Sequence, residues 1–166
     1  MTGDVSRIRD AVSSDAAAIA TIYNQGIVDR IATLETEERA AEERLQWLAG
    51  RGPRHPVLVA ELDGTVVGWG SLNEFNPRKA YDFVADFSVY IERGWRGKGV
   101  GSALLRALIA RAKQLGYHKM VLSAFPWNTA GMALYEKYGF RTVGIYREQG
   151  LLDGKWVDTI VMEKIL

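Results

Sequence analysis

Cysteine is absent from the 166 residues of the sequence. Its absence excludes disulfide bonds, thiolate nucleophiles and zinc sites built on thiolates. Long apolar runs are absent too, so no segment is expected to span a bilayer. The first residues, Met1–Val5, lack the basic and apolar parts of a signal peptide. We therefore expect a cytoplasmic protein.

Histidine is also rare, and neither positive nor negative charge is in clear excess. His55 and His118 show neither the spacing of metal ligands nor a serine–histidine–aspartate arrangement, and we expect no metal. The 21 basic and 20 acidic residues leave a net charge of +1, which argues against a nucleic-acid-binding protein. No internal repeat or linker divides the chain, so residues 1–166 are expected to form one domain.

Hydrophobic periodicity and turn residues predict an alternation of strands and helices. Ser13 or Ser14 is expected to cap the first helix, and the second is expected to bury Ala41, Leu45 and Leu48. Strands are expected at 6–10, 57–62, 65–72, 81–91, 119–124, 140–147 and 156–163, with turns at 63–64 and 153–154. Helices are expected at about 13–26, 37–49, 102–115 and 128–138. This order predicts an α/β protein with a mixed sheet.

The most informative stretch joins a strand to a helix through a glycine-rich basic turn. Residues 83–91 are apolar and predict a buried strand, Arg96–Gly101 form the turn, and the helix from Ser102 ends at Gly116. Glycines let backbone N–H groups approach a phosphate, and a helix N-terminus adds partial positive charge. The turn therefore suits an anion, although a basic turn before an ordinary helix is the alternative.

The glycine spacing separates the phosphate-binding motifs. A P-loop needs Ser or Thr after Gly-Lys, whereas Lys98 is followed by Gly99, and the dinucleotide fingerprint needs one more residue. The spacing Arg96-x-x-Gly99-x-Gly101 resembles the acyl-CoA motif [QR]-x-x-G-x-[GA] of the GNAT N-acetyltransferase family. In that family the loop holds the pyrophosphate of CoA.

A second segment strengthens this resemblance. Residues 128–140 read NTAGMALYEKYGF. They are similar to the family pattern N-x-x-A-x-x-L-Y-[EK]-x-x-G-F, with the central alanine at Gly131 or Ala133. The resemblance covers nearly the whole chain and implies a single-domain GNAT acyl-CoA N-acyltransferase fold that uses acetyl-CoA as co-substrate.

Further segments resemble the phosphinothricin acetyltransferase branch, which includes enzymes for methionine sulfoximine and arsinothricin. The substrates of that branch are glutamate or methionine analogues with a free α-amino group. The resemblance implies detoxifying acetylation of such an amine, and residues 85–90 and 156–159 look most like the arsinothricin-type members. The segments that carry this similarity are 78–82, 89–91, 146–150 and 154–158.

The resemblance implies two catalytic residues. Asp86 occupies the position of a glutamate that accepts the ammonium proton in the branch; it is one methylene shorter, which favours transfer through a water. Tyr135 is placed to protonate or hydrogen-bond the leaving thiolate, where the phosphinothricin enzymes have histidine. The alternatives are a structural acid, buried between strands or facing solvent at a strand edge, and a core tyrosine beside Leu134 and Phe140.

The resemblance also implies the residues that bind acetyl-CoA. Val89 and Ile91 would bind the pantetheine through their backbone groups, as an added strand does. Arg96 and Lys98 would supply charge, and Asn128 would bind the pantetheine, cap its helix, or both. The full expected set is Val89, Tyr90, Ile91, Arg96, Gly97, Lys98, Gly99, Val100, Gly101, Ser102 and Asn128.

For the amino-acid substrate, Arg78 is the expected carboxylate ligand, because a guanidinium binds such groups with two hydrogen bonds. Tyr81 is expected in the same pocket, with Phe75 and Leu34 as apolar walls. A solvated loop arginine is the alternative for Arg78.

Arg147 and Trp156 are assigned to a C-terminal hairpin, which in this branch helps to form a homodimer. Two other functions remain open. One is acetylation of another amine, such as a polyamine or a protein N-terminus. The other is a non-catalytic acyl-CoA sensor.

Overall fold

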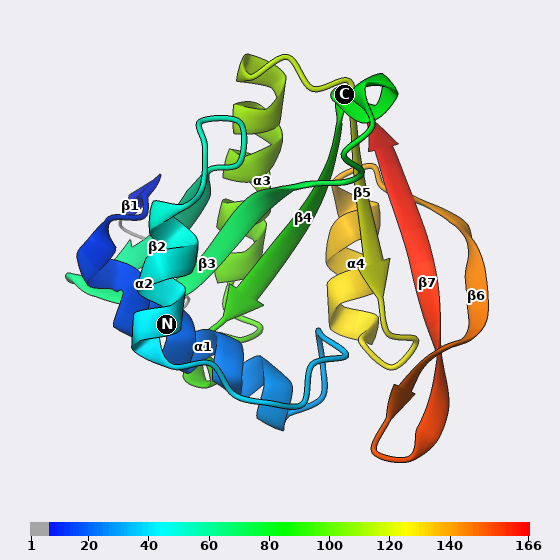
Figure 1. Cartoon of the computed structure of the whole chain (residues 1–166), viewed down its shortest axis with the longest axis horizontal. Coiled ribbons are helices and arrows are strands. Elements are labelled where there is room, and N and C mark those ends of the chain that lie inside the picture. The colour runs from blue at the N-terminus through cyan, green and yellow to red at the C-terminus, as the bar shows by residue number, and fades with distance from the viewer. Residues whose placement is uncertain (1–6) are drawn as a thin grey trace.

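The computed structural model describes residues 7–166, whose strands form one seven-stranded sheet in the order β1-β2-β3-β4-β5-β7-β6 (Figure 1). All neighbouring strands are antiparallel except β4 and β5, which confirms the expected mixed sheet. Ser6, included in the expected first strand, lies outside the described residues. The strands are β1 (Arg7–Asp10), β2 (Val57–Leu62), β3 (Thr65–Glu74), β4 (Val84–Ile91), β5 (Lys119–Ala124), β6 (Arg141–Leu152) and β7 (Lys155–Ile165).

Two apolar clusters lie on opposite faces of the sheet. Because successive side chains of a strand point to opposite faces, Leu58 of β2 packs in the cluster with α3, whereas Val59 packs in the cluster with α1. Figure 1 shows α3 behind the sheet and α1 and α2 in front of it. The four α-helices are α1 (Ala16–Val28), α2 (Ala41–Ala49), α3 (Val100–Gln114) and α4 (Thr129–Lys137).

The expected start and end of the first helix were wrong. Ser13–Asp15 form a short 3₁₀ turn, and the side chain of Asp15 accepts the N–H of Val12 at 2.8 Å, so neither serine caps α1. The helix also continues past Gly26. A Cβ at Gly26 would lie 3.3 Å from Cδ1 of Tyr90, so this glycine permits a close contact with β4 and does not end the helix.

The expected buried face of the second helix was also wrong. Ala41 and Leu45 are exposed, Leu48 is partly buried, and Arg44 is the buried residue, at 8% exposure. The guanidinium of Arg44 lies 4.4 Å from the ring centroid of Trp47, so a cation–π contact replaces the aliphatic packing that the pattern indicated.

Several other boundaries shift by a few residues. Strand β3 continues to Glu74, and β4 begins only at Val84, because Lys79–Tyr81 form a 3₁₀ turn. Strand β5 has the expected bounds, and the expected cap of α4 is confirmed by a 3.1 Å hydrogen bond from the N–H of Gly131 to Asn128 Oδ1. No helix within residues 7–166 is both long and apolar enough to cross a membrane.

Candidate active site

The site begins where the sheet splits. Strands β4 and β5 pair only from Val84–Lys119 to Asp86–Val121, and beyond that point they diverge (Figure 1). The other edge of β5 remains paired with β7 as far as Ala124. Backbone groups on the facing edges of the split are therefore not bonded across it, and an extended polar ligand can bond them as a strand would.

A cavity of about 250 Å³ lies at this split. Its wall combines residues from β4, β5, β7, α4 and the loop between α1 and α2, and no Lys or Arg of the described chain lines it. The lining residues are Ile31, Ala32, Thr33, Leu34, Asp86, Phe87, Ser88, Val89, Leu122, Ser123, Ala124, Phe125, Asn128, Tyr135 and Thr159.

Asp86 is the acidic residue of this wall. Burial raises the pKa of its carboxyl to about 6, and a hydrogen bond from the amide of Asn73 opposes that rise. The distance from Asn73 Nδ2 to Asp86 Oδ2 is 3.4 Å. At neutral pH this carboxyl is therefore ionised yet basic enough to accept a proton.

Tyr135 supplies a group of the opposite kind. Its ring packs edge-on against Phe87 and Phe140, with centroids 5.8 and 6.1 Å away. Burial raises the pKa of the phenol to about 12, so the hydroxyl keeps its proton at neutral pH. A carboxylate base and a phenol acid thus line one cavity, an arrangement that suits proton transfer in both directions.

The glycine-rich turn lies between β4 and α3. Gly97 and Gly99 have φ of +74° and +89°, which L side chains rarely adopt, and a Cβ at either would meet nothing within 4 Å. Side chains are therefore absent on the open side of the turn, before the first N–H groups of α3. Together with the split, this geometry can accept an anionic group at the turn and an extended polar arm between β4 and β5.

The two expected cations of this turn differ in their surroundings. Nη1 of Arg96 lies 2.7 Å from Oδ2 of Asp29, which also binds Arg93 at 2.8 Å. Lys98 Nζ lies 5.2 Å from the ring centroid of Trp95. Much of the charge of Arg96 is therefore offset by Asp29, and its expected role at the pyrophosphate stays a prediction.

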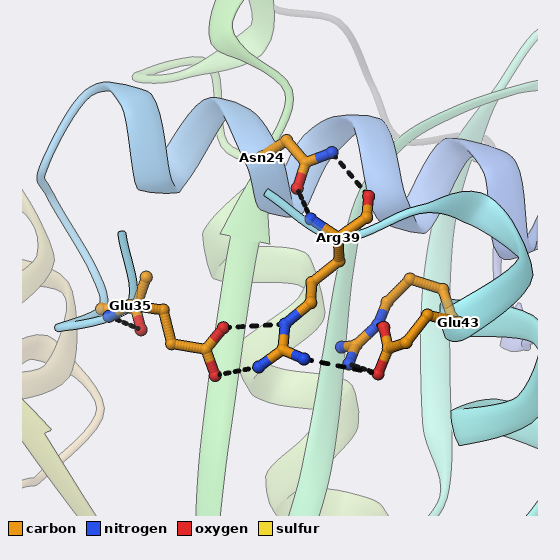
Figure 2. Close-up of polar contacts among 6 residues, drawn as sticks. Asn24, Glu35, Arg39 and Glu43 are labelled. Atoms are coloured by element: carbon orange, nitrogen blue, oxygen red, sulfur yellow. Dashed lines mark hydrogen bonds and ion pairs between the residues drawn. The ribbon is translucent and has the colours of Figure 1, made fainter. Parts of the chain in front are cut away.

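Hydrogen bonds from α1 to the loop that follows it, and within that loop, hold one wall of the cavity. Figure 2 shows Asn24 exchanging two hydrogen bonds with the backbone of Arg39, at 2.9 and 2.7 Å. The guanidinium of Arg39 binds both carboxylate oxygens of Glu35, at 3.0 and 2.8 Å. The N–H of Glu35 in turn donates to Thr33 Oγ1 at 3.1 Å. This network therefore fixes the side chain of Thr33, which lines the cavity.

The first residues of that loop, 30–34, are held by the β6–β7 hairpin and by Trp127. Arg30 forms an ion pair of 2.8 Å with Asp153 in the turn between β6 and β7. The indole N–H of Trp127 donates to the carbonyl of Arg30 at 2.7 Å. Leu34 lies against Gly150, where a Cβ would come within 2.6 Å of Leu34 Cδ1. The hairpin therefore shapes the wall of the cavity.

Some predicted site residues meet in this cavity and others do not. Asp86, Tyr135, Val89, Asn128 and Leu34 all line it. The side chain of Tyr90 instead stacks on Trp69 on the α1 face of the sheet, at 4.8 Å between ring centroids. Only the backbone of Tyr90 therefore faces the split. Ser102 hydrogen-bonds the hydroxyl of Tyr138.

The predicted substrate residues of the β3–β4 connection lie elsewhere. Tyr81 lines a separate cavity of about 290 Å³ with His55 and Glu74. The ring of Phe75 packs edge-on against the ring of Tyr81, with 5.6 Å between the centroids. Arg78 is exposed and lines neither cavity. Their role in substrate binding stays a prediction.

Some polar residues around the cavity could not be predicted from the sequence, chiefly Asn73, Thr33 and Thr159. Asn73 faces Asp86 across the β3–β4 pair. The residues between these strands are too many to fix a register from sequence, so no local pattern could place the two side chains together. No group of three or more His, Cys, Asp or Glu in residues 7–166 is arranged to hold a metal ion.

Comparison with known proteins identifies the family. Residues 19–140 match the Acetyltransferase (GNAT) family. The chain is 32% identical to the L-methionine sulfoximine/L-methionine sulfone acetyltransferase of Salmonella typhimurium over 94% of this chain and 92% of that protein. It is 32% identical to a GNAT superfamily phosphinothricin acetyltransferase of Sinorhizobium meliloti solved with AcCoA, with a TM-score of 0.89 over 98% and 89% of the two chains.

A third comparison widens the range of named activities. The ribosomal-protein-alanine N-acetyltransferase of Brucella melitensis is 35% identical, with a TM-score of 0.93 over 96% of this chain and 99% of that one. These similarities bear out the resemblance, the fold and the enzyme class expected from the glycine motif and residues 128–140. The chain belongs to the GNAT acetyltransferase family and is an N-acetyltransferase.

Proposed function

We propose that this enzyme acetylates the α-amino group of a glutamate or methionine analogue, such as phosphinothricin, methionine sulfoximine or arsinothricin, and so detoxifies it in the cytoplasm. The observation that carries the proposal is the cavity at the β4–β5 split, which is lined by both Asp86 and Tyr135. Its support is the similarity to acetyltransferases named for methionine sulfoximine and phosphinothricin.

Acetyl-CoA supplies an activated acetyl thioester when it is bound. The backbone N–H groups of residues 96–102 hold the pyrophosphate, with charge from Lys98. The backbone of Val89 and Ile91 and the side chain of Asn128 hold the pantetheine arm. These residues orient the thioester toward the point where the two strands separate.

Asp86 accepts the proton that the substrate ammonium must lose before nitrogen has a free electron pair. An α-amino group titrates near about 8, so a carboxylate with a pKa of about 6 accepts this proton directly or through one water. Tyr135 lies on the α4 side of the cavity and donates its phenolic proton to the departing thiolate. Each residue thus carries one proton transfer.

The cavity wall itself suits polar but uncharged substrate groups. Hydroxyls of Thr33, Ser88, Ser123 and Thr159 lie in it, and no cation of residues 7–166 does. A substrate carboxylate therefore needs a cation from outside this wall. Arg78 in the exposed β3–β4 connection is our candidate for that role.

We also propose that the enzyme works as a homodimer built on the β6–β7 hairpin. Strand β6 is an edge strand of the sheet. Exposed apolar side chains mark interaction surfaces where they gather into a patch, and the hairpin carries several such side chains. Those of the hairpin include Val143, Ile145, Tyr146, Leu151 and Trp156. Sedimentation of wild type and Trp156→Glu tests this: a monomeric wild type contradicts it.

A second candidate function is acetylation of a protein N-terminus, which the similarity to the ribosomal-protein-alanine enzyme favours. The polyamine and the non-catalytic sensor remain outcomes of the same test. A polyamine needs several acidic groups, whereas Asp86 is the acidic residue of this wall.

The test is CoA release, followed with a thiol reagent, over a panel of amines. The panel is phosphinothricin, methionine sulfoximine, methionine sulfone, an arsinic glutamate analogue, glutamate, spermidine and a peptide with N-terminal alanine. The protein has no cysteine, so the background is low. Turnover confined to the amino-acid analogues supports the proposal. Turnover of the peptide or spermidine alone, or of nothing while acetyl-CoA still binds, overturns it.

A further inference from the structure

Asn73 and Asp86 face each other across β3 and β4 as a directly opposed pair. Nδ2 of Asn73 lies 3.4 Å from Oδ2 of Asp86 and 3.3 Å from Oγ of Ser88, so its two N–H bonds are directed at two acceptors on β4. Among described residues, Asn73 is the only side chain with a hydrogen bond to the Asp86 carboxylate. The orientation of that amide therefore decides what Asp86 faces.

Arg51 fixes the orientation. Its Nη2 donates to Oδ1 of Asn73 at 2.8 Å, and the hydroxyl of Ser71 donates to the same oxygen at 3.0 Å. A guanidinium has donors only, so the amide oxygen must face Arg51 and the NH₂ group must face Asp86. A flipped amide would place two donors against each other and a carbonyl oxygen against the carboxylate.

Arg51 is itself held in place. Its Nε donates to the carbonyl of His55 at 2.9 Å and its Nη2 to the carbonyl of Leu72 at 2.6 Å. Its guanidinium lies 4.5 Å from the ring centroid of Trp47. These contacts tie Arg51 to the backbone on both sides, so the chain from Arg51 through Asn73 to Asp86 is anchored at its far end.

We propose that Asn73, oriented by Arg51, is a positioning residue that directs the Asp86 carboxylate into the cavity and stabilises its ionised form. The proposal rests on the proposed function, in which Asp86 accepts the substrate proton.

The sign of the effect follows from the groups around Asp86. Burial favours the neutral acid, and the Asn73 donor favours the carboxylate, so loss of the donor raises the pKa of Asp86 further. Arg51 carries a positive charge and acts from behind Asn73, and the carboxyl of Glu35 acts, like that of Asp86, on the phenol of Tyr90. The titratable and polar groups around Asp86 are Asn73 and Arg51 from the β3 side, Ser88 and Tyr90 on β4, Thr33 and Glu35 in the loop and Tyr135 on α4.

The sharpest variant is Asn73→Asp. It keeps the shape and the oxygen that Arg51 and Ser71 bind, but replaces the NH₂ group facing Asp86 by a carboxylate oxygen. We expect the acid limb of the kcat/KM profile to move to higher pH by at least about one unit, so that activity at pH 7 falls at least about twofold and is recovered at pH 9. Asn73→Leu removes the donor without adding charge and should shift the limb in the same direction by less.

Asn76→Asp is the matched control, because it makes the same substitution in the β3–β4 connection, where Oδ1 of Asn76 accepts the N–H of Arg78 at 2.9 Å. It should leave the acid limb in place. A merely structural role of Asn73 would lower activity equally at every pH and lower the melting temperature. An unmoved acid limb in folded Asn73→Asp and Asn73→Leu overturns the proposal.

A second measurement is independent of turnover. The carboxyl carbon of Asp86, assigned by its loss in Asp86→Asn, can be titrated by NMR in the protein without substrate. In Asn73→Leu it should titrate at higher pH than in wild type, and an unchanged midpoint overturns the proposal even if no amine of the panel is acetylated. If the midpoint moves but Asp86→Asn retains full turnover, the assignment of Asp86 as base fails while the positioning of its carboxylate stands.

Discussion

The carboxylate of Asp29 binds the guanidinium of Arg96, with 2.7 Å between Asp29 Oδ2 and Arg96 Nη1. Asp29 follows the last residue of α1, and Arg96 opens the glycine-rich turn before α3. The ion pair therefore fixes the turn to the helix that precedes the cavity loop.

We predict that Asp29→Ala and Arg96→Ala raise the KM for acetyl-CoA by similar factors, about three- to tenfold, and change kcat little. Both variants release the same anchor, so the double variant should be no worse than either single one. Steady-state kinetics of the four proteins check this. An Asp29→Ala variant that binds acetyl-CoA more tightly, because Arg96 is then free to reach the pyrophosphate, contradicts it.

Replacing Asp86 by asparagine should separate activity from stability. We expect Asp86→Asn to lower turnover at least about tenfold with little change in acetyl-CoA affinity, because an amide cannot accept the proton. The folded state raises the pKa of Asp86 to about 6, so it holds this proton more tightly than the unfolded chain does. That contribution to stability is complete below about pH 4 and is lost as the pH rises through 6.

The same variant should therefore be more stable than wild type at pH 8, by at most about 3 kcal/mol, and the gain should shrink toward pH 5. Urea unfolding at both pH values measures it. Unchanged turnover would remove Asp86 from the mechanism, and a stability gain independent of pH would show that its ionisation is not the cause.

Tyr135→Phe tests the acid. The ring contacts with Phe87 and Phe140 do not involve the hydroxyl, so the melting temperature should stay near that of wild type. We expect kcat to fall about ten- to a hundredfold, with a smaller loss for a thioester whose thiol is more acidic and needs less help in leaving. Wild-type kcat in the variant would leave Tyr135 as a packing residue.

Gly150→Ala tests the hairpin as part of the cavity wall. A Cβ at this position would lie 2.6 Å from Leu34 Cδ1, and the flexible end of Leu34 must move. We expect the KM for the amine to rise several-fold while that for acetyl-CoA holds, because small displacements of a positioning wall are costly in catalysis. Adding Leu34→Ala removes the clash; a Gly150→Ala enzyme with an unchanged amine KM contradicts the assignment.

Arg78→Ala tests the proposed substrate cation. Arg78 is exposed in the β3–β4 connection, so its loss should leave folding and acetyl-CoA binding unaffected. We expect the KM for an amino-acid substrate to rise about tenfold or more, since no Lys or Arg among the described residues lines the cavity to take its place. Arg78→Lys, which retains charge without the bidentate geometry, should recover part of it. An unaltered KM would make Arg78 a solvated loop residue.

Local signals in the sequence were sufficient for much of the fold. The limits of β5, the Asn128 cap and the turn at Asp153–Gly154, whose φ values are +51° and +76°, depend on neighbouring residues and were predicted correctly. The buried face of α2 was not, because Arg44 packs against Trp47 of its own helix and against the ring of Tyr23, which comes from α1.

Residues of the candidate site could be predicted only where they lie within a sequence motif. Asp86, Tyr135 and the glycine turn stand in recognisable strand and helix segments. The contacts that complete the site join residues far apart in sequence: Asp29 with Arg96 over 67 residues, and Arg30 with Asp153 over 123. No pattern within one element carries information about such pairs, which depend on how the whole sheet is assembled.

Because the β6–β7 turn contacts the loop after α1, this part of the structure can form only after both segments have been synthesised. A ribosome delivers residues 29–34 early and residues 150–153 near the end of the described chain, so the front wall of the cavity stays loose while most of the protein is made. Strand β5 likewise has β7 as its second neighbour. The wall of the candidate cavity is therefore completed only after β6 and β7 have been synthesised.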